Sequence, residues 1–213
     1  MTHCIINFSV GGWYPRGQER LKNSLNAVGY KNMLFFNDYK QLKGCPEHKD
    51  DPYAFKIYAF EEAFQRGYEN VMWVDSSMFF IRDPTPLFEC SEKDGYFIRY
   101  DGHKAGQWCN DTGLKSFGIT REEAMNMGMF IAGLFILTKD NDTSKEFMVR
   151  WRKSYEAGAF RGSWKDHRHD LVCGSIVANQ LGWKMEQTKK IVAYTCDKRE
   201  YDKSTVYAMC EGM

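Results

Sequence analysis

The sequence lacks several features that would assign a protein to a class at once. No two of its seven cysteines have the CxxC spacing of a zinc ribbon, and their odd number fits a reducing compartment better than a disulfide framework. No stretch reaches the roughly 18 apolar residues of a membrane span. The opening residues, MTHCIINFSVGGW, lack the basic and long apolar regions of a secretory signal. We therefore expect a cytoplasmic protein without a transmembrane segment.

A strong net charge of either sign is also missing. The 29 Lys and Arg residues almost balance the 28 Asp and Glu residues, so no global field indicates a nucleic-acid or membrane partner. The chain contains no GxGxxG fingerprint, no internal repeat and no low-complexity linker. What is present is a composition typical of folded proteins, with 43% hydrophobic and 27% charged residues. A chain of 213 residues suffices for one sizeable core, and we expect a single domain over 1–213.

Strand-like apolar runs alternate with helix-like periodic segments along the chain, which is an α/β pattern. Strands are expected at 3–10, 32–36, 70–75, 95–101, 128–139 and 190–194. Helices are expected at 18–28, 53–66, 121–127, 144–157 and 170–181, with a short one within 83–90. Thr120 with Glu123 and Thr143 with Glu146 have the spacing of capping boxes, which predicts helix starts at these two places.

One of the apolar runs ends in a single carboxylate. In YENVMWVDSSMFFIRDP the run stops at Asp75, and two serines, Ser76 and Ser77, follow it. Ligands of open α/β sheets bind at the carboxyl ends of central strands, so Asp75 is a candidate ligand-binding residue. The alternative is that Asp75 only caps a turn, as Asp often does after a strand.

Three segments of the chain resemble, in order, glycosyltransferases of the GT-A fold. The segment FKIYAFEEAFQRGYENVMWVDSSMFFIRDPTPLF, from Phe55 to Phe88, is similar to that family's lysine-bearing helix, its strand ending in Asp-x-Asp and its Pro-Leu-Phe turn. MGMFIAGLFILTKDN is similar to a Gly-containing strand beside the acceptor, and HRHDLVCGSIVANQLG to a helix whose first acid faces the sugar. The resemblance implies a single GT-A-like, Rossmann-like α/β domain with a mixed central sheet flanked by helices. Its nucleotide-sugar half would be at about 1–100, its acceptor half at about 101–195 and a polar tail at 196–213.

The same resemblance implies a hexosyl- or pentosyltransferase that moves a sugar from a nucleotide-sugar, with a UDP-sugar as the first expectation, to a hydroxyl of a saccharide. In the family, the Asp-x-Asp pair binds a divalent cation and the ribose; here Asp75 is the first acid, and Ser77 in the second position brings no charge. Dependence on Mn²⁺ or Mg²⁺ is therefore open, with Asp75 and His169 as the expected metal ligands and Asp170 as the alternative to His169. Without a metal, Lys56, Arg168 and backbone N–H groups would stabilise the leaving diphosphate.

The resemblance assigns further residues to the two substrates. Lys56 is implied to contact the phosphate or sugar of the donor, and its alternative is a solvated helix lysine. Asp170 corresponds to the acid that orients the sugar or deprotonates the acceptor, and its alternative is a helix N-cap. Backbone amides after the first strand are expected to hold the base or ribose, at Ser9, Val10 and Gly11. Independently of the resemblance, Asp101 and His103 lie in a polar loop after the fourth expected strand and are expected on the acceptor side. Gly133 would let the acceptor or sugar approach the backbone, and its alternative is a β-bulge.

Three other functions stay open at the level of the sequence. The stretch 150–169 has six Lys and Arg against two acids, with aromatic residues between them, which fits either a helix with solvated cations or a DNA-binding surface. The DNA alternative is a transferase that modifies hydroxymethylated bases. The serine at position 77 raises the alternative of a non-catalytic nucleotide- or sugar-binding protein. His167 and His169 raise that of a zinc hydrolase, although they lack the ligand spacing of a structural zinc site.

Overall fold

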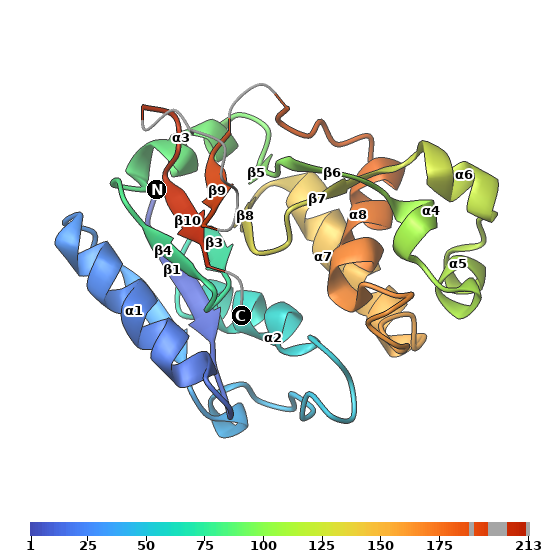
Figure 1. Cartoon of the computed structure of the whole chain (residues 1–213), viewed down its shortest axis with the longest axis horizontal. Helices are drawn as coiled ribbons and strands as arrows, with labels where there is room; N and C mark the ends of the chain where they lie inside the picture. Colours follow the sequence, from blue (N-terminus) through green and yellow to red (C-terminus); the bar gives the residue numbers. More distant parts are fainter. Residues whose placement is uncertain (188–189, 196–203, 212–213) are drawn as a thin grey trace.

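The computed structural model describes residues 1–187, 190–195 and 204–211. Its central layer is a five-stranded sheet of order β2-β1-β3-β8-β5 (Figure 1). The strands are β1 (His3–Phe8), β2 (Met33–Phe36), β3 (Asn70–Val74), β5 (Tyr96–Phe97) and β8 (Leu134–Thr138). β1 pairs in parallel with β2 and β3, whereas β8 runs antiparallel to β3 and β5. The predicted α/β fold with a mixed central sheet is confirmed.

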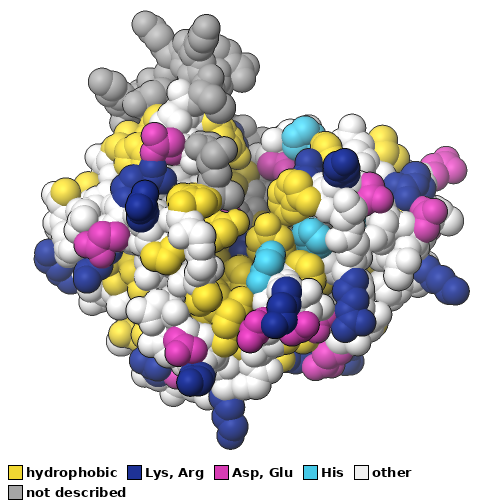
Figure 2. Space-filling model, turned by 60° about the horizontal axis from the view of Figure 1, so that its bottom comes forward, with side chains coloured by type: hydrophobic (Ala, Val, Ile, Leu, Met, Phe, Trp, Pro, Cys, Tyr) yellow, Lys and Arg dark blue, Asp and Glu magenta, His cyan; other side chains and the backbone are white. Residues whose placement is uncertain are grey.

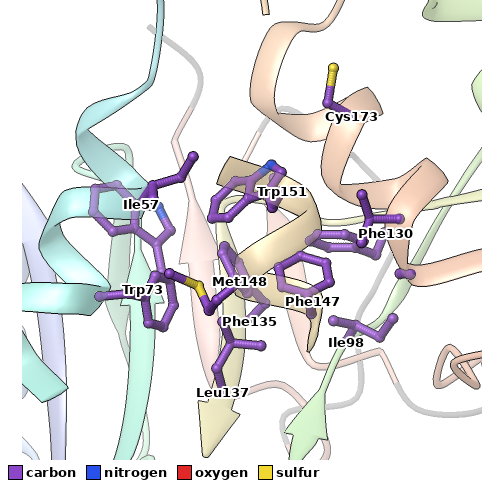
Figure 3. Packing of buried hydrophobic residues seen from close by; sticks show 14 of the residues in the cluster. Ile57, Trp73, Ile98, Phe130, Phe135, Leu137, Phe147, Met148, Trp151 and Cys173 are labelled. Atoms are coloured by element: carbon purple, nitrogen blue, oxygen red, sulfur yellow. The ribbon is translucent and has the colours of Figure 1, made fainter. Parts of the chain in front are cut away.

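Helices cover both faces of this sheet. On one face, α1 (Tyr14–Ala27) and α3 (Thr85–Glu92) pack in one core cluster with Met72 and Val74 of β3. On the other, α2 (Phe55–Gln65), α7 (Asp142–Glu156) and α8 (His169–Gln180) share a cluster with Val71 and Trp73. Figure 3 shows this second cluster, with Phe135 and Trp151 between the sheet and the helices. Because both faces are buried, β3 is apolar at consecutive positions and does not alternate with polar residues.

The remaining elements extend the molecule at both sides of the sheet (Figure 1). A short helix, η1 (Tyr39–Gln41), follows β2, and three helices lie beyond β6 (Tyr100–Lys104), which pairs with β7 (Gly128–Phe130). These helices are α4 (Ala105–Trp108), α5 (Asp111–Phe117) and α6 (Arg121–Asn126). A three-stranded sheet of order β4-β10-β9 is formed by β4 (Met78–Phe80), β10 (Ala208–Cys210) and β9 (Val192–Tyr194). Within the described residues, no helix is both long enough and apolar enough to cross a membrane.

The prediction of a polar tail at 196–213 is wrong for the part that the structure describes. β10 pairs antiparallel with β4 and parallel with β9, and all three of its residues are buried in hydrophobic clusters. Residues 196–203 and 212–213 of the predicted tail lie outside the described residues.

Two predicted strands are each divided in two. The expected strand 128–139 breaks at 131–133, so that β7 pairs with β6 while β8 joins the central sheet. The break turns backbone carbonyls toward the strand end: Gly133 O accepts from the Asp75 N–H at 2.9 Å, and Ala132 O accepts from Lys56 Nζ at 3.0 Å. Similarly, the expected strand 95–101 is divided between β5 and the start of β6, which belong to different sheets.

The two predicted capping boxes have different outcomes. At α6, the Thr120 N–H donates to the Glu123 carboxylate at 2.7 Å, and the Glu123 N–H donates to Thr120 Oγ1 at 3.2 Å, so this box is confirmed. At α7, the N-cap is Asn141, whose side chain accepts from the N–H groups of Thr143 and Ser144. The prediction for Thr143 is wrong because the stronger capping residue stands two positions earlier; Thr143 Oγ1 instead accepts from Trp183 Nε1 at 2.7 Å.

Helix α1 lies against the loop after β3 at Gly17. A Cβ at this position would be 2.3 Å from the carbonyl oxygen of Ser76. Alanine normally stabilises a helix relative to glycine, but here α1 would have to move. We expect Gly17→Ala to lower the free energy of unfolding by about 1–3 kcal/mol, measured by urea denaturation. Lys22→Ala, at an exposed position of the same helix, is the control and should change it little. A Gly17→Ala protein at least as stable as the wild type would contradict this packing.

Candidate functional site

A pocket of about 340 Å³ lies at the carboxyl ends of β1 and β3. Its volume suits a small organic ligand. Figure 2, which brings the lower side of Figure 1 forward, shows hydrophobic side chains gathered around the hollowed centre of the face. The aromatic part of the lining includes Tyr14, Tyr39, Tyr53, Phe55, Trp73 and Tyr194. The charged part consists of three carboxylates and one ammonium among the described residues: Asp75, Asp101, Asp170 and Lys56.

Asp75 lies directly after β3 and is held in one orientation. Its Oδ1 accepts a hydrogen bond from Trp73 Nε1 at 2.6 Å and lies 3.3 Å from Lys56 Nζ. Its Oδ2 faces Gly133, where a Cβ would come within 3.1 Å of this oxygen. The side chain is nevertheless 38% exposed, so the carboxylate is fixed by the protein and open to the pocket.

Lys56 and Asp170 connect two helices at the back of the pocket. Each is the second residue of its helix, α2 for Lys56 and α8 for Asp170, so the first turns of the two helices face each other. Lys56 Nζ lies 2.8 Å from Asp170 Oδ2, and both side chains are buried. Asp170 is not the N-cap of α8, because Arg168 has that position. Because Lys56 is buried, its alternative role as a solvated helix lysine is wrong.

Burial and charge act in opposite directions on this pair. Burial alone would lower the pKa of Lys56, but the carboxylates of Asp170 and Asp75 raise it above its ordinary value. Burial raises the pKa of Asp170, and the Lys56 ammonium offsets this only in part. Asp170 therefore takes up a proton more readily than an exposed aspartate. A carboxylate with a raised pKa in a pocket is suited to general base catalysis.

Two residues beside this ion pair have an unusual backbone. Tyr53 has φ 61° and His169 has φ 42°, both in the left-handed region that non-glycine residues seldom adopt. Their rings lie 5.4 Å apart, and His169 also stacks on Trp164 at 5.5 Å. Such conformations cost about 1–3 kcal/mol each and persist where the surrounding structure enforces them, often at functional sites.

The two histidines predicted as possible ligands bond to backbone carbonyls. His169 Nδ1 donates to Phe160 O at 2.7 Å, and His167 Nε2 donates to Ala159 O at 2.8 Å. Burial lowers the pKa of His167 to about 4, so this imidazole is neutral near neutral pH. No group of three or more His, Cys, Asp or Glu side chains in the described part of the chain is placed to hold a metal ion.

Ser77, at the position of the second family acid, is tied to the helix α1 and to the C-terminal strands. Its carbonyl oxygen accepts from Arg20 Nη2 at 2.9 Å and from the Glu211 N–H at 3.0 Å. Its Oγ accepts from Cys210 Sγ at 3.5 Å. A divalent cation held by a protein takes several oxygen ligands, usually including more than one charged group. One carboxylate that already faces an ammonium, with an uncharged serine beside it, does not fit such a cation.

The structure brings most of the predicted site residues to one pocket. Those that line it are Val10, Lys56, Asp75, Ser77, Asp101, Gly133 and Asp170. Those outside the lining are Ser9, Gly11, His103, Arg168 and His169. The Arg168 guanidinium lies between the rings of Trp108 and Trp164, at 4.1 and 4.3 Å from their centres. Asp101 faces the same pocket as Asp75, and burial raises its pKa.

Several lining residues were not predicted from the sequence, among them Tyr53, Trp73, Tyr194 and Cys210. Trp73 is part of the apolar run before Asp75, and its indole N–H gives it a polar role that the run alone conceals. Tyr194 and Cys210 come from β9 and β10, and no sequence motif relates these strands to the end of β3.

Three of the six Lys and Arg residues of the basic stretch at 150–169 are paired with acids. Arg150 Nε bonds to Glu146 at 2.7 Å within α7, while Arg152 reaches Glu61 of α2 at 2.5 Å. Arg161 Nε pairs with Asp51 at 2.8 Å. The aromatic residues Trp151 and Phe160 of this stretch are buried in the core. The buried Trp151 agrees with the interpretation of a helix packed onto the sheet, whereas the prediction of solvated cations does not hold for the three paired arginines.

Comparisons with known proteins define the fold. No family model matches the sequence, and no curated protein is significantly similar to it. Among solved structures, the bifunctional glycosyltransferase WbbM in its apo form matches with a TM-score of 0.57 and 11% identity, over 98% of this chain and 45% of its own. A glycosyltransferase involved in glycosylating the major capsid of PBCV-1 matches with a TM-score of 0.54 and 10% identity, over 99% and 92%. This chain thus spans less than half of WbbM and has a GT-A-like glycosyltransferase fold.

Proposed function

We propose that this protein is a glycosyltransferase that moves a hexosyl or pentosyl group from a nucleotide-sugar to an acceptor hydroxyl, most simply that of a saccharide. The observation that carries the proposal is the meeting of Asp75 and Asp170 at one ammonium, at the carboxyl ends of the central strands. Both acids line a pocket of suitable size, and the fold is one that known glycosyltransferases use.

In the proposed reaction, the Asp170 carboxylate accepts the proton of the acceptor hydroxyl as its oxygen bonds to the anomeric carbon. The bond from that carbon to the phosphate oxygen breaks, and its electron pair leaves with the nucleoside diphosphate. Asp75 orients the donor, and the aromatic side chains that line the pocket stack against the base or a sugar ring. The first turns of α2 and α8 line the pocket, and the dipole at a helix N-terminus favours anions such as the leaving phosphates. Attack from the face opposite the leaving group would invert the anomeric centre.

A screen of nucleotide-sugars by thermal denaturation tests the donor. We expect one nucleotide-sugar, first of all a UDP-sugar, to raise the melting temperature, because a ligand that binds only the native state stabilises it. The same mixture should slowly release the nucleoside diphosphate, since water can replace the acceptor. Asp75→Asn should abolish the stabilisation. Stabilisation without any release, even with saccharide acceptors present, would indicate a binding protein without turnover, and no response to any donor would contradict the proposal.

The saccharide acceptor is favoured over DNA because three of the six cations expected to hold phosphates, Arg150, Arg152 and Arg161, are paired with acids within the protein. Binding of a short DNA duplex across a salt series decides between the two acceptors. Affinity that falls steeply with salt would favour DNA. No binding at low salt would leave the saccharide.

A further inference from the structure

We propose that Lys56 takes the place of a divalent cation in this site, so that the pocket binds its nucleotide ligand without a metal ion. The identity of the ligand rests on the proposed function. The arrangement of charges around Lys56 does not.

The ammonium of Lys56 is surrounded by oxygen atoms from three separate segments. Asp170 Oδ2 lies at 2.8 Å, Ala132 O at 3.0 Å and Asp75 Oδ1 at 3.3 Å. The Ala132 carbonyl accepts a hydrogen bond from the ammonium, and the two carboxylates form ion pairs with it. The side chain is 4% exposed, so this cation is part of the interior and does not reach into the solvent. Without the Lys56 ammonium, two carboxylates and a carbonyl would lie together with no positive charge between them.

One of the two carboxylate oxygen atoms of Asp75 is already engaged by the protein. Oδ1 already accepts from Trp73 Nε1 and faces the ammonium, and Oδ2 packs against Gly133. A metal ion on this carboxylate would share it with Lys56 at close range. Two cations at that separation repel each other strongly wherever water is excluded.

Position 77 adds no ligand that would overcome this repulsion. The Ser77 hydroxyl is neutral and faces Cys210, and its carbonyl oxygen is already bonded to Arg20 and Glu211. The third carboxylate of the pocket, Asp101, accepts the His103 N–H at 2.8 Å and belongs to no metal-binding group among the described residues. The donor set therefore suits a fixed internal ammonium better than an exchangeable metal ion.

The test measures Mn²⁺ binding by equilibrium dialysis, with no nucleotide present. We expect no stoichiometric Mn²⁺ binding by the wild-type protein. With UDP as the probe, its affinity should change by less than about twofold between EDTA and saturating Mn²⁺. Lys56→Met removes the ammonium and leaves two carboxylates facing each other, so we expect it to bind Mn²⁺ at least about tenfold more tightly than the wild type. Lys49→Met, at an exposed lysine paired with Glu47, is the control and should resemble the wild type.

Each outcome decides the proposal. Stoichiometric Mn²⁺ binding by the wild type, or UDP binding that requires Mn²⁺, would overturn it. A folded Lys56→Met protein with no gain in Mn²⁺ affinity would also overturn it, because the ammonium would then not be what excludes the metal. If Lys56→Met does not fold, the wild-type measurements decide alone. Failure of the proposed function appears separately, as the absence of any response to nucleotides while the dialysis result stands.

Discussion

Asp170→Asn is expected to lower kcat by about 10²- to 10⁴-fold, the usual contribution of a general base. The amide keeps the size of the side chain but cannot accept the proton of the acceptor hydroxyl. Lys56 retains Asp75 and the Ala132 carbonyl as partners, so the fold should survive. Initial rates of transfer with the donor found by the screen, together with circular dichroism, measure the effect.

Asp166→Asn is the matched control, since Asp166 is an exposed acid four residues earlier. It should have the wild-type rate. A folded Asp170→Asn protein with full activity would show that Asp170 is structural and that the base lies elsewhere.

The pH dependence of the rate gives a second measurement of the same role. A base acts in its deprotonated form, so the rate should rise as pH rises through the pKa of Asp170. Because burial raises this pKa, the acidic limb of the profile should lie above the ordinary value of 3.8. The residual activity of Asp170→Asn should lack this limb. A limb that persists in the variant would belong to another group.

Lys56→Met is expected to lower the free energy of unfolding by about 3–5 kcal/mol, because it leaves Asp170 buried without its partner. Methionine has a similar length, so lost packing contributes little. Urea denaturation measures the effect. The double variant Lys56→Met/Asp170→Asn should recover part of it, since no buried charge is then left unpaired at Asp170. A single variant as stable as the wild type would mean that the ion pair contributes no stability.

This contribution has a defined pH window. The folded pKa of Lys56 lies above the ordinary value of 10.5 because of Asp170 and Asp75. The stabilisation is therefore fully present below 10.5 and is lost as pH rises through the folded pKa. The difference in the free energy of unfolding between wild type and Lys56→Met should therefore shrink over this alkaline range. Titration of Lys56 should not change this difference near neutral pH.

The sequence predicted those features that depend on local patterns. A continuous apolar run identifies β3, and the single acid at its end identifies the edge of the sheet where the pocket lies. The Thr120 capping box depends on residues three positions apart and was correct. Local signals of this kind are sufficient to predict the fold class and the position of Asp75 at the end of a central strand.

Features that depend on tertiary contacts could not be read in this way. Lys56 and Asp170 lie far apart in the sequence, and only the tertiary fold brings the first turns of α2 and α8 close enough for the two side chains to pair. The left-handed backbone at Tyr53 and His169 contradicts the local preference of both residues. The break at 131–133 lies inside a run that by pattern alone is one strand. At the break, the carbonyls of Ala132 and Gly133 accept hydrogen bonds from Lys56 and Asp75, and no local pattern shows these contacts.

The C-terminal strands have a consequence for the order in which the protein is completed during synthesis. β10 pairs with β4, and the Glu211 N–H bonds to the Ser77 carbonyl, so a wall of the pocket depends on contacts between distant parts of the chain. Contacts of large sequence separation form late and slow folding. A nascent chain that has emerged only to α8 would contain Asp75, Lys56 and Asp170 but not Tyr194 or Cys210. Ligand binding would then begin only after β10 has left the ribosome.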